Sequence, residues 1–295
     1  MFPDEEACIR YIEGLRWSKG FICPTCNNNE FWRASRERLV CTACRRHVRV
    51  GAGTIFDKTR TPLTTWFEAA WHVTTAKNGM SAKTLERTLG TSYRVAWAML
   101  QRYRIAMVRA ERGQLVGNVE VDEAFVGGVE HGGKRGRGTS KNIVAIAVEI
   151  KQPKGFGRVR MRHIADASGT SLLPFVRDVV MRGASVSTDG WTGYNGLLTH
   201  GYEHQQTVLS NSGDPAHVAM PGVHRIASLL KRWILGTHQG SVTPEHLQSY
   251  LEEFTFRFNR RTSLNRGLVF RRLLEQAVVT DPVTDADVTH GYQWR

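Results

Sequence analysis

The chain has 295 residues, 41% of them hydrophobic, which is enough to form about two domains with a substantial core. No window approaches the roughly 18 uncharged apolar residues of a membrane span, so we expect no membrane association. The first six residues, Met-Phe-Pro-Asp-Glu-Glu, are acidic where a secretory signal is basic, which predicts a cytoplasmic protein.

The net charge is strongly positive and unevenly distributed. It is +13 in total; residues 1–113 hold 19 Lys and Arg against 10 Asp and Glu, a net +9, whereas residues 114–295 hold 21 against 17, a net +4. A basic N-terminal part favours a polyanionic partner, and nucleic acid is favoured over a membrane surface because no basic amphipathic helix stands out.

The N-terminal segment contains five cysteines. Residues 4–15 are expected to form a short helix with Asp4 as its N-cap, and Cys8 in this helix is interpreted as a packed free thiol. The other four form two Cys-x-x-Cys pairs separated by fourteen residues: Cys23, Cys26, Cys41 and Cys44. This spacing predicts a tetrahedral zinc site of four sulfurs, in preference to disulfides, which are unexpected in a reducing compartment.

Residues 31–33 and 38–40 are expected to be the hairpin strands of a zinc ribbon, whose small core requires the metal in order to fold. The basic run after the last cysteine indicates that the module also contacts phosphates, through Arg45, Arg46 and Arg49.

A helical unit is expected next. Residues 63–75 have apolar side chains at helical spacing, which we assign to the core: Leu63, Trp66, Phe67, Ala70 and Trp71. Residues 80–108 have the pattern of a helix-turn-helix, with Ser81 and Ser92 as N-caps and a turn at Gly90. The second helix is expected to turn Arg94, Arg102 and Arg104 outward for DNA contact; the alternative is an ordinary helical hairpin.

After Gly117 the pattern changes to alternating strands and helices. Strands are expected at 119–126, 142–150, 158–164, 184–187 and 206–209, with helices at 170–182 and from about 223. This order predicts an α/β layered domain. The expected domains are therefore 1–55 (helix and zinc ribbon), 60–113 (helix-turn-helix) and 117–279 (α/β catalytic domain), followed by a tail at 280–295.

Two aspartates are candidate metal ligands. Asp122 lies within the first strand, where a carboxylate is costly to bury unless a cation or hydrogen bonds meet it. Asp189 lies at the carboxyl end of the fourth strand, where open α/β sheets form ligand crevices. The alternative for Asp122 is a strand with a solvated polar face.

A helical face after the last strand supplies a third candidate. Lys231 follows His224 by seven positions, so these two and Ser228 share one face of the expected helix. The opposite face is expected to be buried and consists of Val223, Ala227, Leu230 and Ile234.

These motifs together resemble the DDE-type transposases of bacterial insertion sequences, in the group with an N-terminal zinc ribbon. The resemblance runs from Cys23-Pro-Thr-Cys26 through the motif at 121–128, Thr188-Asp189-Gly190 and Leu230-Lys231-Arg232 to the segment 253–261. It implies a ribonuclease-H-like catalytic domain whose ligands are Asp122, Asp189 and, in place of the family's usual glutamate, His224. No acid lies elsewhere with a lysine seven residues on.

The resemblance also implies a mechanism. Two divalent ions, Mg²⁺ or Mn²⁺, clamp the attacking and leaving oxygens; Asp122 bridges them, Asp189 holds one and His224 completes the other. Water cuts one strand at the element's end and the freed 3′-hydroxyl attacks target DNA, while Lys231 grips a phosphate. The partners are double-stranded terminal repeats and target DNA, a second copy of the chain, and the bacterial nucleoid.

Further basic residues are expected along the DNA backbone, with a solvated surface as the alternative: Lys134, Arg135, Arg137, Lys141, Arg232, Arg257, Arg260 and Arg261. Two other functions remain open. One is a catalytically decayed or domesticated DNA-binding protein, in which His224 marks the loss of activity, and the other is a nuclease without strand transfer.

Overall fold

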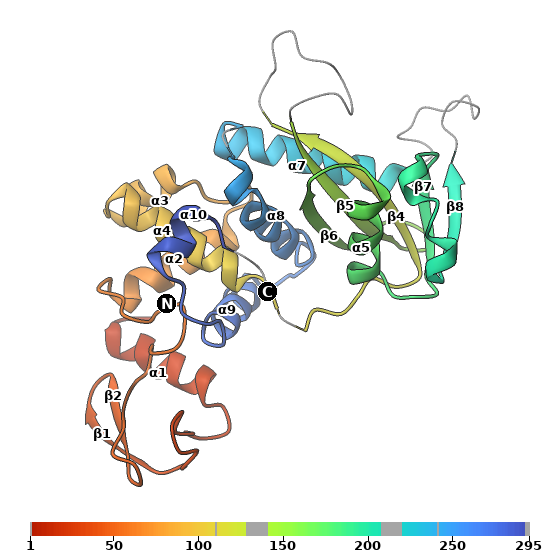
Figure 1. The fold of residues 1–295 in the computed structure, drawn as a ribbon. Coiled ribbons are helices and arrows are strands. Elements are labelled where there is room, and N and C mark those ends of the chain that lie inside the picture. Colours follow the sequence, from red (N-terminus) through yellow and green to blue (C-terminus); the bar gives the residue numbers. More distant parts are fainter. Residues whose placement is uncertain (1, 110, 128–140, 208–219, 241, 293–295) are drawn as a thin grey trace. The chain divides into compact units, whose positions relative to one another are not determined.

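The computed structural model describes residues 2–109, 111–127, 141–207, 220–240 and 242–292 (Figure 1). Contacts divide the chain into two compact units. The first unit comprises Met1–Arg109 together with Ser263–Arg295, and the second unit comprises Ala110–Thr262. Residues 263–279, expected to belong to the catalytic domain, and the expected C-terminal tail therefore pack with the N-terminal part of the chain.

The first unit begins with a helix and a small sheet. Helix α1 (Glu5–Arg16) is capped by Asp4, which accepts a hydrogen bond from the backbone N–H of Ala7 at 2.8 Å. Strands β1 (Phe31–Ser35), β2 (Arg38–Cys41) and β3 (His47–Arg49) form an antiparallel sheet. The structure has the expected helix and hairpin and adds a third strand, and Cys8 is fully buried and free, as predicted.

Helices make up the rest of the first unit. Helices α2 (Leu63–Thr75), α3 (Ala82–Leu89) and α4 (Tyr93–Ala106) are followed, near the C-terminus, by α9 (Arg266–Ala277) and α10 (Asp285–His290). Ser81 and Ser92 cap α3 and α4 as expected, and Gly90 adopts the left-handed conformation that ends α3. The predicted pair of helices is therefore present.

The second helix of this pair is more enclosed than predicted. Helix α4 packs against α2, α3, α9 and α10, and the Tyr103 hydroxyl donates to the backbone oxygen of Trp66 at 2.7 Å. Arg104 is only 1% exposed, so its predicted outward orientation is wrong. A sequence pattern for one helical hairpin did not reveal that C-terminal helices cover the same helix. Trp71, expected in the core, is 37% exposed and lies at the core's edge against Phe270.

The second unit contains a five-stranded mixed sheet, ordered β6-β5-β4-β7-β8. Strands β4 (Asn118–Val126), β5 (Asn142–Ile150) and β6 (Phe156–Ile164) are antiparallel, whereas β7 (Ser185–Asp189) and β8 (Glu203–Thr207) run parallel to β4. Strand β8 begins three residues earlier than predicted, and residues 208 and 209 lie outside the described residues.

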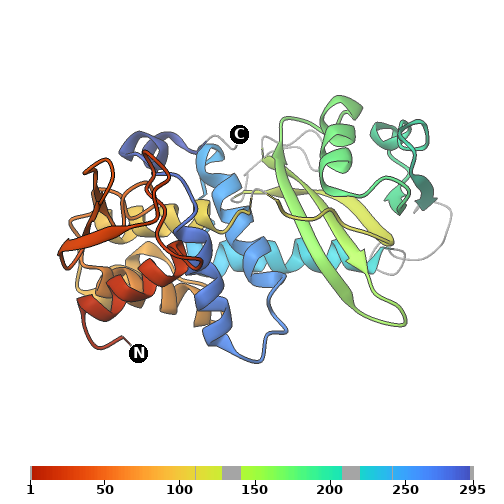
Figure 2. The same ribbon diagram turned by 90° about the horizontal axis from the view of Figure 1, so that it is seen from below.

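Helices cover both faces of this sheet (Figure 2). One face packs on α5 (Gly169–Val179), on the short turn η2 (Thr192–Tyr194) and on Leu197, which precedes the turn η3 (Leu198–His200). The other packs on α7 (Pro221–His238) and α8 (Pro244–Phe258). Helix α5 ends before the predicted residue 182 because Val180 pairs with Leu115 in a β-bridge, which takes up the backbone groups on either side.

Alternation along β4 assigns its side chains to these two faces. Val119 and Val121 enter the core beneath α5, whereas Ala124 and Val126 enter the core beneath α7. Asp122 therefore faces α7, and Glu123 faces the opposite side. The strand order and this alternation position the acidic residues.

Candidate functional sites

The four predicted zinc ligands are brought together. The sulfur atoms of Cys23, Cys26, Cys41 and Cys44 all lie within 4.8 Å of one another. The Cys23–Cys44 and Cys26–Cys41 sulfur distances are 3.6 and 3.5 Å. Tetrahedral geometry with Zn–S bonds of about 2.3 Å separates sulfurs by about 3.8 Å, so the cluster fits a zinc ion closely.

Two matching backbone turns build this cluster. In each, the residue after the second cysteine has a left-handed conformation, with φ of 60° at Asn27 and 58° at Arg45. The N–H groups of Asn27 and Arg45 donate to the oxygens of Cys23 and Cys41 at 3.0 and 3.1 Å. Hydrogen bonding from the backbone of Cys44 lowers the pKa of Cys41 to about 6, which favours the thiolate that binds metal.

The basic residues beside the cluster have different surroundings. The guanidinium of Arg45 lies 4.9 Å from the centre of the Trp32 ring. Arg49 pairs with Glu37 at 3.3 Å, and its side chain remains 58% exposed. Arg46 is exposed. All three lie on the ribbon, as predicted, where they are available to solvent to different degrees.

Asp122 and Asp189 lie on adjacent parallel strands. The paired register runs from Asn118 with Ser185 to Glu120 with Ser187, and Asp122 and Asp189 each follow two residues after its last pair. Because Val186 enters the core beneath α5, alternation directs Asp189 to the same face as Asp122, toward α7. The sheet thus aligns the two predicted carboxylates by position and by face.

Local hydrogen bonds orient both carboxylates. One oxygen of Asp122 accepts from the backbone N–H of Glu123 at 2.8 Å, and one oxygen of Asp189 accepts from Trp191 at 3.1 Å. Burial first, and then the charges of Glu123, Asp122 and Asp189, raise the pKa of the buried Tyr194 hydroxyl well above its ordinary value.

The third predicted ligand begins the helix that covers this face. His224 is the fourth residue of α7, it is half-buried, and its Nε2 atom is shielded from solvent. Ser228 and Lys231 are exposed on the same helix, while Val223, Leu230 and Ile234 are buried, as expected. Among the described residues, the potential ligands that come close enough to share one ion are the four cysteines; Asp122, Asp189 and His224 do not form such a cluster.

Sequence reasoning did not identify two residues of this region. Glu120 is 7% exposed, and its carboxylate accepts from the backbone N–H of Val223 at 3.0 Å. Burial raises its pKa, against the effect of the hydrogen bonds from Val223 and Gly222. The only sequence signal was its place two residues before Asp122. Arg225 adds an exposed cation to α7 and follows His224 directly.

The remaining basic residues fall into four groups. On α4, Arg94 pairs with Asp285 at 2.8 Å and Arg102 donates to the oxygen of Val283 at 3.3 Å. Lys141 is half-buried beside Gly127, and Arg232 is exposed on α7. Lys134, Arg135 and Arg137 lie outside the described residues.

The arginines at the end of α8 and just after it contact other residues of the chain. Arg257 lies 3.7 Å from Glu253. Arg260 and Arg261 stack over Phe256 and Phe258, each 3.9 Å from the ring centre, and donate to backbone oxygens. These contacts give all three arginines a structural role.

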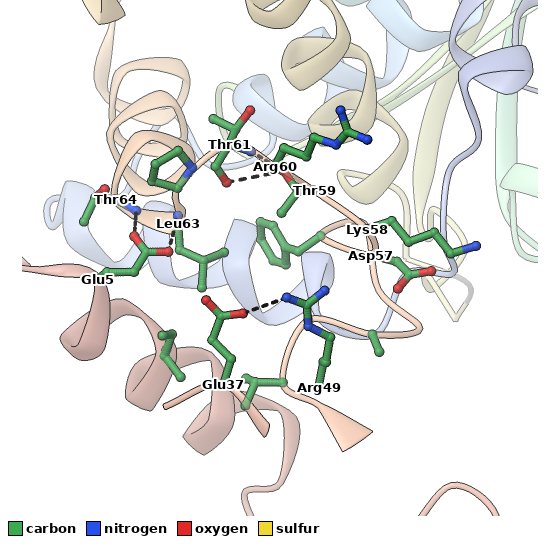
Figure 3. A pocket seen from close by; sticks show the side chains of 16 residues that line it. Glu5, Glu37, Arg49, Asp57, Lys58, Thr59, Arg60, Thr61, Leu63 and Thr64 are labelled. Atoms are coloured by element: carbon green, nitrogen blue, oxygen red, sulfur yellow. Dashed lines mark hydrogen bonds and ion pairs between the residues drawn. The ribbon is translucent and has the colours of Figure 1, made fainter. Parts of the chain in front are cut away.

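A cavity of about 520 Å³ lies in the first unit, between α1 and the connector to α2 (Figure 3). Glu5 accepts from the N–H groups of Leu63 and Thr64 at 2.7 and 3.0 Å and so caps α2. The lining has three acidic and three basic side chains, and none of the predicted catalytic residues. Its balanced charge provides no selectivity for a charged ligand.

Comparison with known proteins gives the class of each part. Residues 3–47 match the model of a transposase zinc-ribbon domain, and residues 114–259 match that of an ISXO2-like transposase domain. These matches place the chain among the insertion-sequence transposases that have an N-terminal zinc ribbon. DNA is accordingly its partner.

A similar protein from Halobacterium salinarum is described as an uncharacterized protein in transposable element ISH50. It is 27% identical over 275 residues, covering 87% of this chain and 91% of the relative. Among the described residues, no helix is long and apolar enough to cross a membrane.

Proposed function

We propose that this transposase cuts DNA strands at the ends of its element and joins them to target DNA, using divalent ions held by Asp122, Asp189 and His224. The observation that carries the proposal is the alignment of Asp122 with Asp189 on adjacent parallel strands, on the face covered by α7. The strand order β6-β5-β4-β7-β8 supports a ribonuclease-H-like domain, in which acidic residues meet in this way.

Each residue has a defined part in this proposal. A divalent ion bound here supplies Lewis-acid assistance to the attacking and leaving oxygens of an in-line phosphoryl displacement. Asp122 and Asp189 provide negative charge and oxygen ligands, and His224 provides one neutral nitrogen. Because the imidazole replaces a charged carboxylate, we expect looser ion binding than with three acids, and a preference for Mn²⁺ over Mg²⁺.

Exposed cations hold the DNA backbone in this proposal. Lys231, Arg225 and Arg232 are exposed on α7, the helix that carries His224 in its first turn. The ribbon adds Arg45, Arg46 and Arg49, and the helical pair adds Arg94 and Arg102. Contacts of this kind supply affinity that falls steeply with salt and carries no sequence information. Joining two element ends in one reaction also calls for at least two copies of the chain.

Cleavage of the element's own ends by the full-length protein tests this function. We expect nicked and joined products with Mn²⁺, fewer with Mg²⁺, and none from Asp122→Asn, Asp189→Asn or His224→Ala, all of which retain DNA binding. Asp178→Asn is the matched control, because Asp178 is an exposed acid on α5 of the same unit, 2.9 Å from Arg162. His200→Ala is the control for the histidine.

The same assay separates the alternatives. Cleavage without joined products would indicate a nuclease. If the wild type binds element ends but cuts nothing with either metal, the chain is a DNA-binding protein that has lost catalysis. If only His224→Ala cuts as well as the wild type, another group completes the metal site.

A further inference from the structure

Two buried glutamates flank Asp122 on β4. Glu120 is 7% exposed and Glu123 is 9% exposed. A buried carboxylate is costly unless hydrogen bonds replace its lost water. Each of these glutamates accepts a hydrogen bond from a different element, and each of those elements carries or adjoins one of the other candidate ligands.

Glu120 holds the start of α7. Helix α7 has no side-chain cap of its own at Met220, so its first N–H groups need another acceptor. The Glu120 carboxylate provides it, accepting from Val223 at 3.0 Å and also from Gly222. Val223 directly precedes His224. The hydrogen bonds to Glu120 therefore fix the position of the His224 backbone relative to β4.

The start of α7 lies close to β4 at Gly222. A Cβ atom at Gly222 would lie 2.8 Å from the Glu120 carboxylate and 2.6 Å from the side chain of Ile150. A side chain at this position would therefore displace the ends of these two side chains. The Gly222 position therefore allows the helix terminus to sit directly on the carboxylate.

Glu123 holds the chain that follows Asp189. Tyr194, in η2, is fully buried, and its hydroxyl donates to Glu123 at 3.0 Å. The segment before it is anchored by Trp191, whose ring N–H donates to the oxygen of Ala167 at 2.6 Å and whose backbone N–H donates to Asp189. The raised pKa of Tyr194 keeps its proton in place for this hydrogen bond.

The hydrogen bond between Glu123 and Tyr194 lies just beyond the end of the pairing between β4 and β7. The ladder between β4 and β7 ends at Glu120 and Ser187, two residues before Asp122 and Asp189. The two aspartates thus lie beyond the last paired residues, and the separation of their backbones is not set by the ladder. The Glu123–Tyr194 bond lies just past them and ties the two chain segments together.

We propose that Glu120 and Glu123 are positioning residues of the metal site: Glu120 places His224 through the first turn of α7, and Glu123 places Asp189 through Tyr194. The inference rests on the proposed function. Strand β4 then carries the ligand Asp122 itself. It holds α7 on one face of the sheet and the segment that follows β7 on the other. Neither glutamate is a metal ligand in this arrangement. The carboxylate of Glu120 is hydrogen-bonded to the backbone of α7, and Glu123 lies on the face of the sheet opposite Asp122.

The sharpest test is Tyr194→Phe, which removes one oxygen and keeps the ring. The matched control is Tyr202→Phe, which also removes a buried hydroxyl from the second unit, there donating to the oxygen of Val180 at 3.1 Å. Mn²⁺ binding to full-length, zinc-loaded protein is measured by titration calorimetry, with melting temperature and DNA binding in parallel. We expect Tyr194→Phe to weaken Mn²⁺ binding by about 10- to 100-fold. Tyr202→Phe should bind Mn²⁺ as the wild type does and should lower the melting temperature by a similar amount.

Substitutions of Glu120 test the other half of the proposal. Glu120→Gln retains an oxygen that can accept from Val223, whereas Glu120→Ala retains none. We expect Glu120→Ala to weaken Mn²⁺ binding at least about tenfold and Glu120→Gln to restore most of it. Glu149→Gln is the control, since Glu149 is a partly buried acid of β5 that accepts from Arg158 and from the N–H of Val116.

The outcomes distinguish failure of the positioning role from failure of the proposed metal-dependent function. If the wild type binds no Mn²⁺ beyond the zinc site, the proposed metal centre and its positioning both fail. If the wild type binds Mn²⁺ and Tyr194→Phe and Glu120→Ala bind it equally well, only the positioning role is overturned. A loss of binding that is matched in Tyr202→Phe and Glu149→Gln would likewise overturn it, because it would reflect stability alone.

Discussion

At the scale of single residues, the surroundings on β4 separate three acids that look alike in sequence. Asp122 faces α7 and is half-exposed, which leaves it accessible to a cation. Glu120 lies on the same face but accepts a hydrogen bond from the first turn of α7. Glu123 points to the opposite face of the sheet and accepts a hydrogen bond from the hydroxyl of Tyr194. The same carboxylate chemistry thus remains accessible in one position and accepts hydrogen bonds from neighbouring elements in the other two.

Two half-buried histidines of the sheet unit should make its stability depend on pH. Burial lowers the pKa of His163 and of His204 below the ordinary value of 6.5. The unfolded chain then takes up protons that the folded chain resists, so the free energy of unfolding falls as pH drops through 6.5. Hydrogen exchange of β5 amides at several pH values measures this effect.

The double variant His163→Gln and His204→Gln should flatten that pH dependence. His290→Gln, which changes an exposed histidine of the other unit, should leave it unchanged. An equally steep dependence in the double variant would show that other groups control the acid sensitivity of the sheet.

At the scale of elements, α7 depends on one buried stripe for its attachment to the sheet. Leu230 is fully buried against β4 and β5, whereas Leu235 on the same helix is 68% exposed. Leu230→Ala should therefore lower the free energy of unfolding of the second unit by about 2–5 kcal/mol. Leu235→Ala should change it by less than about 0.5 kcal/mol.

Denaturant unfolding followed by exchange of β4 and β5 amides checks this prediction. Equal effects of the two substitutions would mean that α7 is not held by the stripe. Because α7 also carries His224 and Lys231, loosening it should weaken Mn²⁺ binding as well.

The zinc ribbon should depend on its metal. It has a small core, so we expect about one zinc ion per chain and unfolding of residues 20–50 when the ion is removed. Cys41→Ser should reproduce that loss in the metal-loaded protein, as seen by metal analysis and amide exchange. Cys8→Ala should retain full zinc content, since Cys8 lies in α1 outside the cluster. Zinc retained at full stoichiometry by Cys41→Ser would contradict the four-sulfur site.

At the scale of the whole molecule, the chain returns to its first unit after completing the second. Helix α9 packs on α2, with Phe270 among the rings of Phe2, Phe67 and Trp71. The backbone N–H of Ile55 also points to the oxygen of Ala277 at 3.5 Å. The first unit is therefore discontinuous in sequence.

Removing residues 263–295 should consequently unfold the N-terminal helices and leave the sheet unit folded. The expected result is loss of amide protection in α2 and α4, with β4 and β5 protected as in the full chain. Supplying 263–295 as a separate peptide should restore part of the protection. If the truncated protein keeps α2 and α4 fully protected, α9 and α10 are not part of that core.

Local patterns in the sequence determined most elements and the zinc ligands. Two Cys-x-x-Cys pairs bring four sulfurs together through short turns, so their spacing alone predicted the cluster. Strands β4 and β5 and helices α2 and α7 also follow from hydrophobic periodicity, and the starts of α1, α3 and α4 follow from their capping residues, because these signals act within a few residues. Asp122, Asp189 and His224 were identified as candidates by motif and order.

The tertiary structure alone decided which surfaces are covered and which acids hold other elements. Arg104 has the helical spacing of an outward cation, yet its side chain is buried. Helix α4 packs against α9 and α10, which lie some 160 residues later in the sequence. Glu120 and Glu123 are indistinguishable from solvated strand residues until α7 and η2 lie against them. Periodicity records only whether a position is polar, whereas burial and hydrogen-bond partners depend on segments far away in sequence, and these are set when the whole chain folds.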